Sequence, residues 1–350
     1  MQADAPDGIP PSASVPDLGQ RAARTARPGR PGRTARPGTG PSLLAPGAAH
    51  DPYRLYRVLR EEYPLSYDAP LGAWLLSRHA DVSTALTDPR FTGFPHDGEP
   101  RGGPAPRGLC HGSRLCLPRP QDIARPAATV PRHLTERVER TAYVLARRIA
   151  GWQQADLVEE FCRWLPVGAA SASAASPDLG QAPGNPTAPC AGRTGLRETA
   201  LASFLANLLD DPDLLAALRI EPALAHRAWT ESLRRDPPVQ VVLRRTVAEV
   251  RVSGGTLPAG APVACLIGAA NRDPERYAAP DLFDPFRTDQ GRSIAGPESC
   301  PAVLLGRLEA EQGVHALLDA MPRLRWADGF RPCSTGLLTR GPRTLLVQPG

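Results

Sequence analysis

The chain has 350 residues, of which 41% are hydrophobic, so it is long enough to bury a large core. Its 41 prolines and 32 glycines predict long irregular segments and an ordered part that is shorter than the chain. The net charge is +5, and +3 of it lies in residues 1–40, which hold six arginines and three aspartates. The charge of the remaining residues is nearly balanced, which argues against a basic face on the folded body and against a nucleic-acid partner.

The first 50 residues differ sharply in pattern from those that follow. Residues 1–50 are rich in arginine, proline and glycine without periodicity, and we expect them to form a disordered tail. A helix is expected from Asp51, which can cap it, with Pro52 in its first turn. Two short strand-like runs around a turn at residues 69–72 come next, and then a second helix that ends at Asp88.

Two low-complexity stretches, at residues 94–130 and 168–195, are expected to be flexible segments of a single domain that covers residues 51–350. Helical spacing fills the region between them. Beyond the second stretch the pattern predicts, in order, helices over 198–216, with a break at Asp211, and over 224–235, strand-like runs over 239–246, 249–257 and 261–268, and a last helix over 302–320. Helices dominate and strands are a minor part, which is typical of the α+β class.

The seven cysteines do not describe a disulfide framework, because their number is odd and their spacing is irregular. Reduced thiols in a cytoplasmic protein fit this pattern better. No secretory signal is expected, and the longest apolar run, at residues 262–270, is too short to cross a bilayer. Cys110, His111 and Cys116 lack a fourth ligand at a recognisable spacing, so no metal site is expected there.

Four segments carry motifs in an unbroken order: DPYRLYRVLREEYPLSYD, TESLRRDPPVQVVLRR, GAANRDPERYAAPDLFDPFR and CPAVLLGRLEAE. They resemble, in turn, the N-terminal helix and hairpin, the Glu-x-x-Arg helix, the Asn-Arg-Asp-Pro to Phe-Asp-Pro-x-Arg segment and the cysteine loop of bacterial cytochrome P450s. The resemblance covers about residues 51–93 and 196–349, with weaker similarity across 131–167. It implies a shortened cytochrome P450 fold, with irregular insertions in place of the distal lid.

The resemblance gives a structural role to three residues and a catalytic role to two. Glu231, Arg234 and Arg287 would form the family's Glu/Arg/Arg cluster. The i,i+3 spacing also places Glu231 and Arg234 on one side of a helix, where they can pair; the alternative is a solvated ion pair of little energetic value. Glu198 and Thr199 would be the acid–alcohol pair that relays protons on the distal helix. Alternatively, these two residues simply begin a helix.

The resemblance also identifies haem-site residues, several of which depart from the family pattern. Cys300 would be the thiolate ligand of haem iron, while Arg244 and Gly296 would help to bind the cofactor. Ile294 replaces a glycine of the loop, and Glu298 puts an anion where the family has a cation beside a propionate. The other departures are Ser293 for phenylalanine, Ala302 for the glycine after the cysteine, and Gln290 for an upstream histidine.

An intact scaffold with an altered haem site resembles a branch of the P450 superfamily in actinobacterial secondary metabolism, whose members stabilise and activate deoxysugar glycosyltransferases, often without haem. The resemblance therefore implies a non-oxidising auxiliary partner of a glycosyltransferase in antibiotic biosynthesis, with no cofactor. The alternative is a haem b monooxygenase that hydroxylates or epoxidises a small hydrophobic metabolite with electrons from ferredoxin. The cysteine at position 300 favours this alternative, although a buried cysteine can also persist as an ordinary apolar residue.

Overall fold

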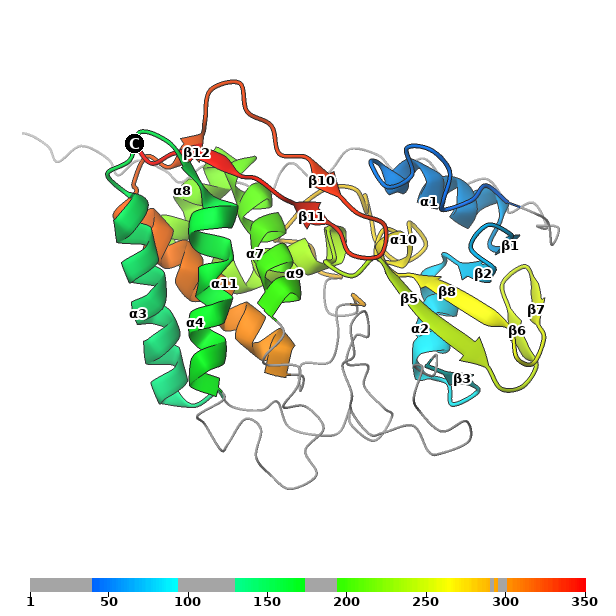
Figure 1. The fold of residues 1–350 in the computed structure, drawn as a ribbon. Helices are drawn as coiled ribbons and strands as arrows, with labels where there is room; N and C mark the ends of the chain where they lie inside the picture. Colours follow the sequence, from blue (N-terminus) through cyan, green and yellow to red (C-terminus); the bar gives the residue numbers. More distant parts are fainter. Residues whose placement is uncertain (1–39, 94–129, 174–193, 290–292, 295–300) are drawn as a thin grey trace, which may run out of the picture. The chain divides into compact units, whose positions relative to one another are not determined.

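The computed structural model describes residues 40–93, 130–173, 194–289, 293–294 and 301–350 (Figure 1). Helices outweigh strands within these ranges, which confirms the expected α+β class. In the same ranges, no helix is both long enough and apolar enough to cross a membrane.

The helices follow the expected periodicity closely. They are α1 (Pro52–Glu62), α2 (His79–Thr87), α3 (Arg132–Ile149), α4 (Trp164–Ser173), α7 (Thr194–Leu209), α8 (Pro212–Ile220), α9 (Leu224–Arg235), α10 (Ile267–Ala270) and α11 (Pro301–Ala320), with a π-helical segment, η2 (Val158–Cys162), before α4. The expected cap of α1 is present, since the Asp51 carboxylate accepts from the backbone N–H of Tyr53 at 3.1 Å.

The strands form one larger sheet and several small ones. They are β1 (Leu65–Asp68), β2 (Ala73–Leu76), β3 (Phe91–Thr92), β4 (Ala155–Asp156), β5 (Val241–Thr246), β6 (Val250–Val252), β7 (Gly255–Leu257), β8 (Pro262–Leu266), β9 (Arg325–Trp326), β10 (Ser334–Thr335), β11 (Gly341–Pro342) and β12 (Leu346–Gln348). The main sheet has the order β1-β2-β8-β5-β3, in which β2 and β8 are parallel. This pairing joins the N-terminal hairpin to the C-terminal half of the chain.

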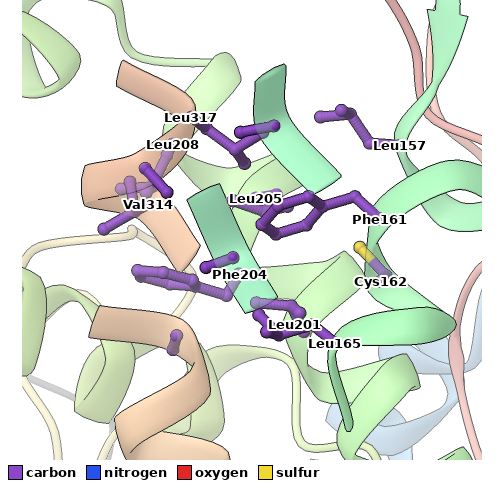
Figure 2. Close-up of a cluster of buried hydrophobic side chains, with 14 of the residues drawn as sticks. Leu157, Phe161, Cys162, Leu165, Leu201, Phe204, Leu205, Leu208, Val314 and Leu317 are labelled. Atoms are coloured by element: carbon purple, nitrogen blue, oxygen red, sulfur yellow. The ribbon is translucent and has the colours of Figure 1, made fainter. Parts of the chain in front are cut away.

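The largest apolar core lies among α3, α4, α7 and α11. On α7 the buried residues Leu201, Phe204 and Leu208 recur three or four positions apart, as a buried helix requires. Figure 2 shows them near Phe161 of η2 and Leu317 of α11. This core holds α7 and α11, which the resemblance identifies as the distal and proximal helices.

The folded body begins before the expected boundary at residue 51. Leu43 is 1% exposed, and its backbone N–H donates to the Asp68 carboxylate at 2.7 Å. Arg340 donates to the carbonyl oxygens of Ala49 and His50 at 2.7 and 2.6 Å. The expected tail is therefore wrong for residues 40–50, because one buried leucine and a few backbone hydrogen bonds leave no periodic signal. The rest of the expected tail lies outside the described residues.

The expected flexible segments also need one correction. Residues 168–173 continue α4, where Ala169 is buried in the core and Gly168 lies so close to α3 that a Cβ would come within 2.8 Å of Thr141 Cγ2. An alanine-rich stretch has a high helix propensity even where its composition is of low complexity. The remainder of both segments lies outside the described residues, as do Cys110, His111 and Cys116.

Candidate functional site

The cysteine loop is described only where it begins. Cys300 and Gly296 lie outside the described residues, as do Gln290 and Glu298. At the start of the loop, the buried Asn271 side chain holds the backbone of Ile294: its Oδ1 accepts from the Ile294 N–H at 2.8 Å and its Nδ2 donates to the Ile294 carbonyl at 3.0 Å. The Asn-Arg-Asp-Pro segment, which begins at Asn271, therefore fixes the entry to this loop.

Glu231 is the centre of a buried cluster on α9. Its two carboxylate oxygens each accept from Arg234 at 2.8 Å, and Arg287 Nε donates to Oε1 at 2.9 Å. The side chains of Glu231 and Arg234 are 0% exposed, so the pair is not a solvated one. The structure thus brings together the three residues that the sequence analysis placed in one cluster. A charge buried in this way is stabilised by its oppositely charged partner, and removal of that partner destabilises the fold.

Arg234 connects the cluster to the segment that follows β8. Its guanidinium donates to the carbonyl oxygens of Asn271, Pro280 and Leu282, at 2.8, 2.7 and 3.0 Å. The planar fork of arginine suits this multiple bonding, because its five donors point in fixed directions. Helix α9 is therefore attached to the same segment that positions the cysteine loop.

Glu198 and Thr199 have separate partners on α7. The Glu198 carboxylate lies 3.9 Å from Arg163 Nε, and burial raises its pKa while the charge of Arg163 opposes this rise. The Thr199 hydroxyl donates to the Gly195 carbonyl at 2.9 Å. Its methyl group faces β11, since a Cβ on Gly341 would lie 2.5 Å from Thr199 Cγ2. No hydrogen bond between the two side chains joins them as an acid–alcohol pair in the described part of the chain.

A buried ion pair joins α7 to α11 at the residue next to Glu198. Arg197 donates to the Glu309 carboxylate and also to the Pro166 carbonyl of α4, the latter at 3.2 Å. The two side chains are 3% and 1% exposed. Burial raises the pKa of Glu309 to about 7, with the charge of Arg197 opposing the rise. Glu309 Oε2 has no hydrogen-bond partner among the described residues.

This pair was not predicted from the sequence, although the sequence contains a signal for it. Arg197 lies within a helix whose other residues are largely buried, and Glu309 lies between buried neighbours on α11. Charged residues are almost never fully buried unless they are paired. Two such residues, each in a largely apolar helix, thus indicate an ion pair, but the sequence does not say which partner each one takes.

Arg244 lies in the main sheet on β5 and is 9% exposed. Its guanidinium donates to the Leu243 carbonyl at 3.0 Å. It also lies close to Cys265 of β8: burial raises the pKa of that thiol to about 12, and Arg244 opposes the rise. A largely buried guanidinium favours an anion beside it, so the charge of Arg244 suits a haem propionate.

Two described positions on the haem side carry a larger side chain than the family pattern has. The family pattern on the distal helix is Gly-x-Glu-Thr, whereas Gly195 precedes Glu198 by one residue too many, which puts Leu196 at the glycine position. Ile294 occupies a glycine position of the loop. Both side chains pack against the apolar cluster of the main sheet, so both fill space that glycine would leave free. Arg197 and Glu309 also tie the distal helix directly to the proximal one.

Comparison with known proteins supports the motif assignment. The model of the cytochrome P450 family matches residues 223–301, which contain the Glu231 cluster. Protein DesVIII of Streptomyces venezuelae is 30% identical over an alignment of 354 positions, which covers 86% of this chain and 86% of that protein. Pulcherriminic acid synthase of Bacillus subtilis is 34% identical over 162 residues, or 43% of this chain and 40% of that enzyme. The match thus spans less than half of the synthase but most of DesVIII.

The fold is shared with solved P450 structures. Cytochrome P450epoK with bound epothilone D superimposes with a TM-score of 0.70 and 22% identity, covering 88% of this chain and 98% of that chain. Similarity at this level of identity establishes the architecture and leaves the activity open. Together with the alignment to DesVIII along most of both chains, it shows that the chain belongs to the cytochrome P450 superfamily.

Proposed function

We propose that the protein is a non-oxidising auxiliary that stabilises or activates a glycosyltransferase in antibiotic biosynthesis. The observation that carries this proposal is the contrast between the complete Glu231 cluster and the altered residues on the haem side. Leu196 and Ile294 fill space where the family pattern has glycine, and Arg197 with Glu309 joins the helices on either side. A scaffold of this kind can fold and bind a partner protein without activating oxygen, because one fold can serve different functions.

The extent of the alignments supports the same proposal. DesVIII aligns along 86% of its length, whereas pulcherriminic acid synthase aligns along 40% of its length. Similarity to the enzyme is therefore partial. The free thiols Cys162, Cys265 and Cys333 among the described residues are consistent with a cytoplasmic location, which we include in the proposal.

A second candidate function is that of a haem-thiolate monooxygenase with a ferredoxin partner. The cysteine at position 300 and the largely buried Arg244 favour it, because they match the positions of an iron ligand and a propionate partner. When bound to a thiolate, haem supplies an iron centre that favours O–O cleavage. The Glu198 and Thr199 side chains would then have to leave their present partners to move a proton together.

An absorption spectrum separates these two functions. Protein expressed with ample haem precursor is purified, reduced under carbon monoxide, and checked for folding by circular dichroism. We expect folded protein without a Soret band. A red-shifted Soret band, typical of a thiolate-bound ferrous carbonyl, would overturn the auxiliary proposal in favour of the enzyme. Cys300→Ala is the matched control, because it removes such a band only if the thiolate is the ligand.

A further inference from the structure

The outer face of α3 is basic, contrary to the expectation from net charge. This helix carries five arginines and two glutamates. Leu134 and Ile149 lie on its buried side, whereas Arg137, Arg140 and Arg147 are exposed at spacings of three and seven residues, which places them on one face. A nearly balanced total charge conceals such a face, since it does not show how charges are distributed around a helix.

These arginines have no counter-charge of their own. Arg137, Arg140 and Arg147 form no ion pair with any carboxylate in the described ranges of the chain. Arg148, by contrast, is paired with Glu160 at 2.5 Å. Glu136, which pairs with Arg132, and Glu139 are also exposed on α3, so the helix carries an excess of positive charge, which attracts an oppositely charged surface.

Two exposed apolar side chains lie on α3 and on the neighbouring α4. Val144 of α3 is 63% exposed and Trp164 of α4 is 48% exposed. The two helices lie side by side and antiparallel (Figure 1): Gly168 approaches Thr141, and Arg148 is bonded to η2, which precedes α4. Val144 and Trp164 are therefore at the same level along the seam. Tryptophan and arginine side chains are both enriched among the residues that contribute most to binding at protein interfaces.

We propose that the α3–α4 surface, formed by Arg137, Arg140, Val144, Arg147 and Trp164, docks an acidic amphipathic helix of a partner protein. The proposal deepens the proposed function and rests on it, because an auxiliary protein requires a surface for its partner. Arg137 and Arg147 are ten residues apart, or about 15 Å along α3, which matches about three turns of a partner helix. Carboxylates on one side of that helix would face the arginines, and its apolar residues would cover Val144 and Trp164.

The composition of the surface favours an acidic protein as its partner over a nucleic acid or an anionic lipid surface. A nucleic acid would be met by a longer run of cations with few apolar side chains between them. A lipid surface would need a broader apolar face than one valine and one tryptophan. An apolar centre with a charged rim is instead the usual anatomy of a protein interface.

The test uses the full-length protein and a fluorescent helical peptide of about 15 residues, with glutamates on one side and leucines on the other. Its anisotropy is titrated at about 50 mM and about 200 mM salt. We expect Arg137→Ser/Arg140→Ser/Arg147→Ser to weaken binding by about tenfold and Val144→Ser to weaken it by a few fold, and higher salt to weaken wild-type binding. The matched control, Arg54→Ser/Arg251→Ser/Arg323→Ser, removes three exposed arginines elsewhere and should change affinity by less than about twofold.

Each contrary result overturns the surface assignment in a recognisable way. Equal weakening by both triple variants would mean that only total charge matters. Binding of a DNA duplex of similar length, with no binding of the peptide, would assign the surface to nucleic acid. No binding of either probe would remove the assignment altogether. None of these results depends on haem content, so a failure of the surface and a failure of the auxiliary proposal are distinguishable.

Discussion

Two buried ion-pair sites in this chain contrast in what they connect. The Glu231 cluster joins α9 to the segment after β8, with each carboxylate oxygen bonded and both arginines satisfied. The Arg197–Glu309 pair joins α7 to α11, and Glu309 Oε2 has no hydrogen-bond partner among the described residues. The first site matches the family pattern, and the second lies beside positions that depart from it. The contrast teaches that the scaffold and the haem side of one fold can change independently.

The largest expected effect is on the complete cluster. Glu231→Gln would leave the buried charge of Arg234 without a counter-charge and Arg287 with Asp289 alone, which costs about 3–5 kcal/mol of the free energy of unfolding. Urea unfolding followed by circular dichroism measures this loss. Glu136→Gln removes the partner of the exposed Arg132 and, as the matched control, should cost less than about 1 kcal/mol. Similar midpoints for the two variants would contradict a structural role of the cluster.

The next effect concerns the incomplete site and its dependence on pH. The folded-state pKa of Glu309 is about 7, above its ordinary value of 4.5, so the folded state binds more protons than the unfolded state between these two values. The free energy of unfolding should therefore fall as pH rises from about 4.5 to about 7, by at most about 1.4 kcal/mol per pH unit. The stabilisation is fully present below about pH 4.5 and lost above about pH 7.

Glu309→Gln removes this titration and should flatten the curve over the same range. Urea unfolding at a series of pH values measures the slope for each variant. Glu311→Gln, which changes a partly exposed glutamate on the same helix, should leave the slope in place. An unchanged slope in Glu309→Gln would show that other groups produce it.

A smaller effect is expected where the two regions meet, at Asn271. Asn271→Ala removes both hydrogen bonds to Ile294 and should cost about 1–3 kcal/mol, because buried backbone groups lose their partners. Hydrogen exchange at Ile294 should also become faster. Asn207→Ala is the matched control: Asn207 is buried and bonds Ser232 and Asp236 instead, so its loss should leave exchange at Ile294 unchanged. Equal exchange in both variants would show that Asn271 does not hold the loop.

Periodicity made much of the helical scaffold predictable. The helix expected over residues 224–235 is α9 with the same bounds, and the last helix differs from α11 by one residue. Both contain regular apolar stripes, which depend on local sequence alone. Residues 40–50 were assigned wrongly, because their order depends on Asp68 and Arg340, which are distant in the sequence.

The site was less predictable for the same physical reason. The Glu231 cluster could be predicted from the sequence, because Glu231 and Arg234 are three residues apart and Arg287 belongs to a recognisable motif. Arg197 and Glu309 are 112 residues apart, and nothing in the local pattern pairs them. The basic face of α3 was missed because it depends on the angular order of charges around one helix, which a total charge does not contain.

The smallest expected effect is that of Glu198→Gln with Thr199→Val, and it bears most directly on the difference between scaffold and haem side. The Glu198 carboxylate is 25% exposed and 3.9 Å from Arg163, and the Thr199 hydroxyl bonds a carbonyl of its own helix. Neither contact is strong, so the free energy of unfolding should change by less than about 1 kcal/mol. In a working acid–alcohol relay the same change would slow oxidation by about 10²–10⁴-fold. Ferredoxin-driven oxygen consumption is therefore measured for both proteins, and we expect none in either. Consumption that the wild type shows and the double variant loses would place a functional relay on α7 and overturn the auxiliary proposal.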